Sequence, residues 1–386
     1  MPNKENIFPE ETELSEIVLQ KTNQAFEMIR QEDTDHVDKT AFRSRIFFRQ
    51  KAVAIAVVCI LAVSSISAAA AIHQYWGRGM KGNIQASDAQ QQELTESGAA
   101  KVYRDDPDYS SLAVTDNGVT IVPDTVIVDD RFAYMSFRIS GYSVDEGVEP
   151  GFETIEVYQG DNPEDKDSRV NMTGTMYDGI KPDKKGAPVY EDGSSIESYE
   201  DGNTIRHYKD RDGTMEYVIQ ASIVNESDSL LGKTMHVKFK NLGSHLKAGF
   251  ISAMEGNWNF EITLSDVNLT RNIKVGQEVE GTDFVMEDII ISPISMRVNY
   301  SVSKAPETKE DDIGIPEVRG VVLKDGTKIP YLTNGGATGY TDSTMSNAYQ
   351  MAGYTRVIDV DEITALIVLT SSGNKKVEIP ISEKKG

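Results

Sequence analysis

The sequence predicts a mainly β chain: two extracellular antiparallel β-sandwich domains on a single-pass transmembrane helix, with a short N-terminal helical cytoplasmic segment. Three observations predict this arrangement. A long uncharged run lies near the N-terminus, basic residues gather on one side of it, and short stretches of alternating apolar and polar residues fill the chain beyond it. Such alternation is typical of half-buried strands.

The uncharged run covers residues 52–72, between Lys51 and Arg78. As a helix, these 21 residues would span about 31 Å, close to the roughly 30 Å hydrocarbon thickness of a bilayer. A helix satisfies its own backbone polar groups and can therefore cross lipid. The alternative, a buried helix of a soluble domain, would rarely stay uncharged over this length.

Basic residues give the predicted anchor a direction. Those that precede it outnumber Arg78 and Lys81, which follow it. The preceding ones are Lys39, Arg43, Arg45, Arg49 and Lys51. The positive-inside rule then places residues 1–51 in the cytoplasm and residues 73–386 outside the cell membrane. The rival is a cleaved signal peptide ending at the small residues 67–71, although signal peptides begin with a much shorter charged region.

Composition narrows the classes of partner and compartment. The 386-residue chain has a formal net charge of −22, most of it in the predicted exterior. Such an acidic surface argues against nucleic acid as a partner. The single cysteine, Cys59, lies inside the predicted anchor, so the exterior has no disulfide and no thiol nucleophile. An exterior without disulfides is more typical of a bacterial surface, particularly a Gram-positive one, than of an animal secretory pathway.

The cytoplasmic segment is predicted to contain one amphipathic helix, over residues 13–31, because apolar residues recur there at helical spacing. The residues expected to contact a partner are Leu14, Ile17, Val18, Ala25, Phe26 and Ile29. One such helix cannot bury its apolar face alone. It therefore docks on a partner protein, on a second copy of the chain, or on the membrane surface.

Residues 73–105 follow the anchor as a juxtamembrane linker. Ser87 is the expected N-cap of a short helix, and Gly98 lies near the end of that helix. We expect the stretch as a whole to be a plain spacer.

The first β domain is predicted over residues 106–270. Strands are expected at 118–122, 124–128, 132–139, 153–158, 216–224, 234–242 and 257–264, with a turn at 129–131. Trp258, Phe260, Ile262 and Leu264 alternate with polar residues and should line one face of a sheet. Residues 159–215 are rich in Asp, Gly, Lys and Pro, so we expect long, polar hairpin loops there, at the edge or the tip of the sandwich.

The second β domain is predicted over residues 271–386. Strands are expected at 284–292, 295–303, 318–323, 362–370 and 376–381, with tight turns at 324–327 and 371–374. Pro293 interrupts an apolar run and therefore marks a corner or an edge. Gly335, Gly336 and Gly339 are placed in a polar loop.

Residues that could carry catalysis or bind a metal form no convincing constellation. No exterior histidine has the setting of a catalytic triad, and His236 alternates as a strand residue. No zinc-protease or phosphate-loop motif is present. Residues 210–213 resemble the start of a calcium loop, but Ala221 stands where an EF-hand needs a carboxylate. Turn chemistry explains the Asp-Gly pair, so we expect no enzyme, no metal site and no cofactor.

Three stretches of the exterior resemble a known family. Residues 114–122 (VTDNGVTIV) and 129–137 (DDRFAYMSF) follow the Ala-rich anchor, and residues 289–300 (IIISPISMRVNY) are similar to the opening of a C-terminal immunoglobulin-like domain. The layout resembles the membrane-bound anti-sigma factors of Gram-positive bacteria whose ectodomain is a domain of unknown function. The resemblance implies immunoglobulin-like exterior domains. It also implies that the cytoplasmic segment holds an extracytoplasmic-function sigma factor inactive until an outside signal releases it.

The chain departs from many anti-sigma factors in one respect. Those proteins carry a zinc motif of the His-x-x-x-Cys-x-x-Cys type, whereas residues 1–51 hold no cysteine and only His36. Any sigma contact would be made without zinc, with the helix of residues 13–31 docking its apolar face into a groove of the sigma factor. The competing hypothesis is a cell-surface binding or adhesion protein, in which the inside segment only extends the anchor.

Overall fold

The structure is a computed structural model. It describes residues 75–144, 148–160, 168–184, 187–225, 227–246, 249–306, 314–370 and 375–381. The predicted cytoplasmic helix and the predicted anchor lie outside the described residues. Those that are described belong to one compact unit, Ile72–Gly386.

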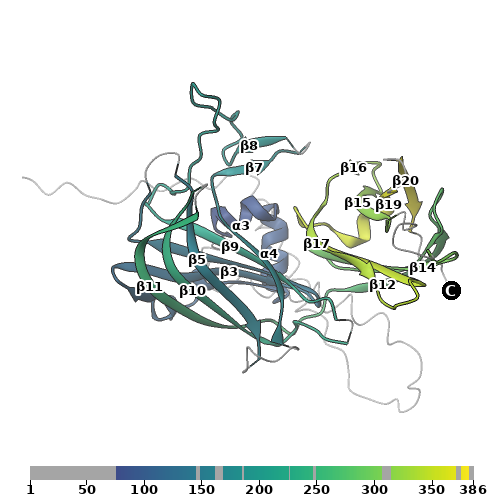
Figure 1. Ribbon diagram of the computed structural model, residues 1–386, viewed down its shortest axis with the longest axis horizontal. Helices are drawn as coiled ribbons and strands as arrows, with labels where there is room; N and C mark the ends of the chain where they lie inside the picture. The colour runs from purple at the N-terminus through teal and green to yellow at the C-terminus, as the bar shows by residue number, and fades with distance from the viewer. Residues whose placement is uncertain are drawn as a thin grey trace, which may run out of the picture. The chain divides into compact units, whose positions relative to one another are not determined.

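Antiparallel sheets dominate the described residues, which confirms the mainly β prediction. The first sandwich-like pair of sheets has a six-stranded layer in the order β1-β3-β4-β9-β6, with β2 paired to β3, and a three-stranded layer in the order β11-β10-β5 (Figure 1). Its strands are β1 (Ala100–Val102), β2 (Val114–Asp116), β3 (Val119–Val128), β4 (Phe132–Ser140), β5 (Pro150–Gln159), β6 (Asn171–Met176), β9 (Met215–Ser222), β10 (Thr234–Leu246) and β11 (Gly249–Thr263).

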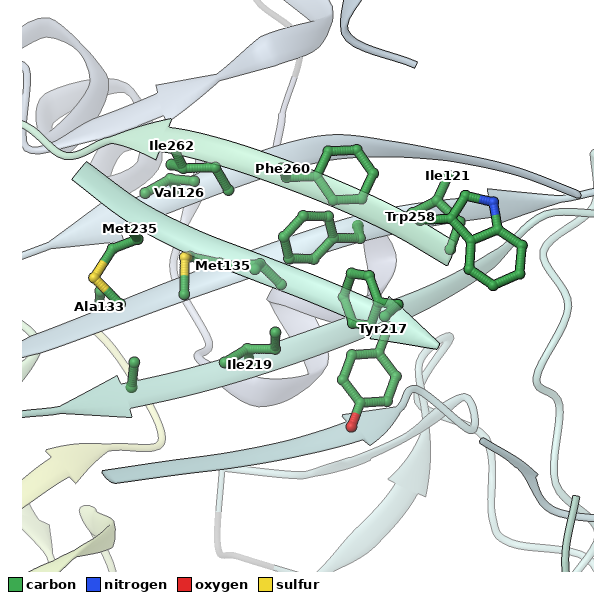
Figure 2. Close-up of a cluster of buried hydrophobic side chains, with 14 of the residues drawn as sticks. Ile121, Val126, Ala133, Met135, Tyr217, Ile219, Met235, Trp258, Phe260 and Ile262 are labelled. Carbon is green, nitrogen blue, oxygen red and sulfur yellow. The ribbon is translucent and has the colours of Figure 1, made fainter. Parts of the chain in front are cut away.

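The core of this first sandwich lies between its two layers. Trp258, Phe260 and Ile262 of β11 are buried there, as their alternation predicts, and Leu264 is buried just beyond the strand. Figure 2 shows β11 side chains facing residues such as Met135 of β4 from the opposite layer. Aromatic rings reinforce the contact between layers, with Phe137 and Phe239 centred 5.0 Å apart, edge to face.

Strands β4 and β9 are buried on both faces, which simple alternation does not predict. Met135 and its neighbours at even spacing pack into the core between the layers. The opposite face of β4 carries Phe132 and Tyr134, which belong to a second apolar cluster. That cluster also contains Trp76 and Met80, from the chain directly after the predicted anchor.

The second sandwich-like pair of sheets has the orders β12-β13-β14-β18-β17 and β16-β15-β19-β20 among the described residues. Its strands are β12 (Arg271–Glu278), β13 (Phe284–Ile291), β14 (Ser295–Val302), β15 (Glu317–Leu323), β16 (Lys328–Ile329), β17 (Thr333–Tyr340), β18 (Asn347–Tyr354), β19 (Ile363–Thr370) and β20 (Lys375–Pro380). Pro293 lies at the corner between β13 and β14, as predicted. The turn predicted at 371–374 lies outside the described residues.

One loop prediction is wrong, and a second is incomplete. Gly335, Gly336 and Gly339 lie in strand β17, paired with β18. The register shifts at Gly336, where an added Cβ would lie 2.0 Å from the Met351 carbonyl oxygen, so the close approach of the two backbones requires glycine. The polar stretch 159–215, where long hairpin loops are predicted, contains the hairpin of β7 (Ile180–Pro182) and β8 (Pro188–Tyr190), and also strand β6, which pairs with β9 and is not predicted.

Candidate functional site

The residues predicted to contact a partner lie outside the described residues. They are Leu14, Ile17, Val18, Ala25, Phe26 and Ile29. Within the part of the chain that the structure describes, no helix is both long and apolar enough to cross a membrane. The candidate site is therefore built from the first described residues, which we call the juxtamembrane segment (residues 75–102).

The juxtamembrane segment is built into the first sandwich. Helix α3 (Arg78–Asn83) packs on β9 and β4. Trp76 is 2% exposed, and Met80 and Ile84 are fully buried. Met80 lies within α3, Trp76 precedes the helix and Ile84 follows it in extended backbone, so the helix and both of its flanks contribute side chains to one apolar cluster. The prediction of a plain spacer is therefore wrong.

The second helix of the segment, α4 (Asp88–Glu96), begins where the sequence predicts. Ser87 accepts a hydrogen bond from the Gln90 backbone N–H, and the Gln90 side chain bonds back to the Ser87 N–H, which completes a capping box. Leu94 is buried against the same apolar cluster as Trp76. Gly98 ends the helix with a positive φ of 84°.

Glycines allow the segment to approach the sheet closely. A Cβ at Gly77 would lie 2.5 Å from Asp124 Oδ2 and 2.6 Å from Glu216 Oε2, and a Cβ at Gly79 would lie 2.8 Å from Glu216 Oε2. At Gly82, a Cβ would lie 1.9 Å from the Tyr177 ring. The backbone therefore rests directly on the side chains beneath it, and the site holds two carboxylates close together.

The carboxylate of Glu216 binds the backbone of the juxtamembrane segment. It is 1% exposed, and its two oxygens accept hydrogen bonds from the backbone N–H groups of Arg78 at 3.1 Å and Gly79 at 2.6 Å. Asp124, also fully buried, pairs with Arg104 Nε at 2.9 Å and accepts from Thr125 Oγ1 at 3.0 Å. The segment and the sheet are thus joined by charge-assisted bonds to a buried carboxylate.

The protonation of Glu216 is set by opposing effects. Burial, the largest effect, and the neighbouring Asp124 charge together raise the pKa of Glu216 to about 7. The Gly79 N–H and the Arg138 and Arg104 guanidinium groups act in the opposite direction. Because a buried carboxylate next to another is costly, the join between the segment and the sheet depends on a proton.

Arg78 connects the segment to the polar region of 159–215. Its Nε pairs with Glu191 at 2.8 Å, and its terminal nitrogens donate to the carbonyl oxygens of His207 at 2.7 Å and Tyr208 at 3.1 Å. The guanidinium group also lies over the Tyr177 ring, 5.0 Å from its centroid. Part of the polar region 159–215 therefore binds the juxtamembrane segment through Arg78.

Gln85 joins the segment to two further elements. Its side chain donates to the Pro182 carbonyl of the β7–β8 hairpin. Its backbone N–H donates to Thr355 O at 2.8 Å and its carbonyl accepts from Val357 N at 2.8 Å, directly after β18. Gln90 adds a side-chain bond to Val357 O at 3.1 Å. The segment thus contacts the first sandwich, the hairpin and the second sandwich.

A second buried carboxylate joins the two sandwiches directly. Asp129, in the predicted turn between β3 and β4, accepts from the backbone N–H groups of Arg131 at 2.8 Å and Phe132 at 2.7 Å. Its other oxygen accepts from the hydroxyl groups of Ser292 and Ser295, at the Pro293 corner. This corner lies within residues 289–300, so one of the motifs behind the resemblance forms an interface between the sandwiches.

Tyr134 makes a second connection between the sandwiches. Its hydroxyl donates to Tyr354 O at 3.1 Å and accepts from Tyr354 N at 2.9 Å and from Gln220 Nε2 at 3.1 Å. Gln220 Nε2 also lies 3.1 Å from Asn334 O. A Cβ at Gly353 would lie 2.0 Å from Gln220 Nε2, so glycine is required for this contact.

Groups considered for metal binding or catalysis have structural contacts. Among the described residues, no group of three or more His, Cys, Asp or Glu side chains is placed to hold a metal ion. Asp212, in the stretch that resembles a calcium loop, accepts from the Thr214 backbone N–H at 2.9 Å and pairs with Arg138. His236 lies on β10, stacked on Tyr158 with ring centroids 4.8 Å apart.

Comparisons with known proteins do not identify the chain. No protein-family model matches the sequence, and no curated protein matches it. The crystal structure of a conserved domain protein from Bacillus anthracis is similar at 16% identity and a TM-score of 0.40, over 68% of this chain and 78% of that one. The N-terminal periplasmic domain of ScsB from Proteus mirabilis is similar at 9% identity and a TM-score of 0.19, over 70% and 97%.

Sequence reasoning missed Asp124 and Glu216 as site residues. Both lie in strands whose pattern was recognised, but an acid at alternating spacing normally faces water. One signal could have shown otherwise: the run WGRGMKGN has three glycines between buried apolar positions, directly beyond the predicted anchor. Glycine at that frequency indicates a backbone that approaches another surface closely.

Proposed function

We propose that this chain is a membrane-anchored anti-sigma factor. Its cytoplasmic segment sequesters an extracytoplasmic-function sigma factor, and its two immunoglobulin-like outer domains respond to an envelope signal. The observation that supports this best is the burial of the juxtamembrane segment. Trp76 and Met80 are core residues of the outer domain, yet only a few residues separate them from the predicted anchor at 52–72.

This arrangement suits signal transmission better than passive attachment. A passive anchor needs only a solvated linker, which can change without affecting the fold. Here the backbone N–H groups of Arg78 and Gly79 are bonded to Glu216, so any change in the sheet moves the chain that enters the membrane. The coupling is a physical contact with two arrangements, docked and undocked.

The sigma-binding half of the proposal is tested on the cytoplasmic helix. We expect Ile17→Asp combined with Phe26→Asp to abolish co-purification of the sigma factor with the full-length chain and to raise transcription from its promoters, because charges on the apolar stripe prevent docking. The matched control is Gln20→Asp combined with Asn23→Asp. It adds the same charge on the face of the predicted helix opposite the apolar stripe. The control is expected to retain the partner.

Two outcomes would contradict the proposal. One is equal recovery of the sigma factor with the wild type and with the stripe variant. The other is unchanged transcription when residues 1–38 are deleted, which is what the adhesion hypothesis predicts.

A further inference from the structure

A cationic cavity lies where the juxtamembrane segment, the β7–β8 hairpin and the chain after β18 meet. Its volume is about 680 Å³. Lys81 of α3, Lys181 and Lys184 of the hairpin region, and Arg356 line it, and among the described lining residues Asp183 is the single acid. A lining with four cations and one carboxylate contrasts sharply with a chain whose net charge is −22.

Few acids lie close to the cations of this cavity. Among the described carboxylates other than Asp183, none forms an ion pair within 4.0 Å of any of the four. Lys181 Nζ donates to the backbone oxygen of Glu191 at 2.5 Å, and Lys81 Nζ lies 5.2 Å from the Tyr75 ring centroid. Arg356 Nε is buried and has no hydrogen-bond partner. A buried donor without an acceptor is costly, and an anion in the cavity would supply the acceptor.

Burial disfavours the charged forms of Lys81 and Arg356 in this cavity. Burial lowers the pKa of Lys81, and the nearby cations Arg104 and Lys181 lower it further, although Asp88 and Glu216 oppose them. Burial also lowers the pKa of Arg356, and the nearby Asp183 charge opposes that shift. Like charges are held together only at a cost, and a bound anion removes that cost.

Hydrogen bonds of Gln85, which carries no charge, connect the elements around the cavity. Gln85 bonds through its backbone to Thr355 and Val357, and through its side chain to Pro182. These bonds position the hairpin and the chain after β18 around the segment without using any of the four cations. The cations are therefore available to a ligand in a preformed frame, as binding sites usually provide.

We propose that this cavity binds a small ligand that carries a phosphate group on a partly apolar body. Phosphate matches several Lys and Arg donors around one multiply charged group. The side chains of Ala86, Pro182 and Val357 contribute apolar wall for the remainder of the ligand. A free phosphorylated molecule and a phospholipid headgroup share this chemistry. The inference does not depend on the anti-sigma assignment, because binding is measured on the chain itself.

The test is calorimetric titration of the full-length chain, kept in a nonionic detergent, at physiological ionic strength. Inorganic pyrophosphate probes a free phosphate, and short-chain soluble phosphatidylglycerol, compared with phosphatidylcholine of the same chain length, probes a headgroup. We expect Lys181→Gln combined with Arg356→Gln to weaken binding at least tenfold. The control pair, Lys324→Gln with Lys328→Gln, removes two exposed cations of the second sandwich and should change affinity less than twofold.

Each outcome decides between defined alternatives. Binding of pyrophosphate, or of phosphatidylglycerol alone, that is lost in the first pair supports the proposal and identifies the source of the phosphate. Lys181→Arg keeps the charge and should keep binding, which separates loss of the ligand from loss of the fold. Equal affinity in the wild type and the first pair, no binding of any probe, or equally tight binding of citrate would overturn the proposal.

Discussion

Two buried carboxylates join parts of this chain, and they differ in how completely their charge is compensated. Asp129, between the sandwiches, accepts hydrogen bonds from two backbone N–H groups and two serine hydroxyls. Glu216, between the sheet and the juxtamembrane segment, accepts from two N–H groups and lies beside a second buried acid, Asp124.

The difference separates a permanent joint from a conditional one. In the described part of the chain, no second acid is among the contacts of the Asp129 carboxylate, and its four bonds come from neutral donors that oppose the rise of its pKa by burial. Losing any of them therefore leaves the buried carboxylate less compensated. At Glu216 the neighbouring charge of Asp124 works against the bond to Gly79, so the strength of the joint depends on protonation. We infer that the two sandwiches stay together while the segment beside the predicted anchor can be released.

Removing the permanent joint should have the largest effect. Asp129→Ala leaves two buried N–H groups and two hydroxyls without their acceptor, so we expect the free energy of unfolding to fall by about 3–5 kcal/mol. Asp129→Asn keeps one oxygen for the N–H groups of Arg131 and Phe132 and should cost about half as much. Urea unfolding of the full-length chain measures both. A loss of less than 1 kcal/mol, on the order of a surface substitution, for Asp129→Ala would show that this joint is not structural.

The conditional joint should be revealed by pH. The pKa of Glu216 rises from 4.5 in its ordinary range to about 7 in the folded chain, so the folded state binds a proton that the unfolded state has lost. The stabilisation from this proton is complete below pH 4.5 and disappears as pH rises through 7, a change of roughly 3 kcal/mol. Glu216→Gln cannot lose a proton, and we expect its stability relative to the wild type to increase between pH 5 and pH 8.

The matched control for this titration is Glu93→Gln on α4, an exposed acid of the same segment. Its stability relative to the wild type should stay constant over the same range. Unfolding midpoints at several pH values for the three proteins make the comparison. Parallel curves for the wild type and Glu216→Gln would mean that Glu216 titrates normally and that the two joints do not differ.

The contrast between the joints also shows what the sequence could predict. Alternation in Phe132–Ser140 and in Trp258, Phe260 and Ile262 placed these residues in strands, and Asp129 in a turn, because each signal is local. Alternation of apolar and polar residues along a strand does not predict which part of the chain covers its second face. Glu216 lies on a face that is normally solvated, and it becomes a site only because a glycine-rich segment from more than a hundred residues earlier lies on it.

The smallest predicted effect separates the two serines of the permanent joint. Ser295 Oγ contributes one hydrogen bond, to Asp129, whereas Ser292 Oγ bonds to Asp129 and also accepts from the backbone N–H groups of Ile294 and Ser295 at 3.0 Å each. Ser295→Ala should therefore cost about 1–2 kcal/mol, and Ser292→Ala distinctly more, because it also leaves two buried N–H groups without their acceptor.

The same pair tests whether Asp129 stays ionised. Burial raises its pKa, and the two hydroxyls oppose that rise. Removing one hydroxyl strengthens the upward shift, so the cost of Ser295→Ala should be greater at pH 8 than at pH 5, in the same direction as the pH effect at Glu216. An equal cost of Ser295→Ala at pH 5 and at pH 8 would mean that its hydroxyl does not support the charge of Asp129. Asp129 would then not differ from Glu216 in how its charge is compensated.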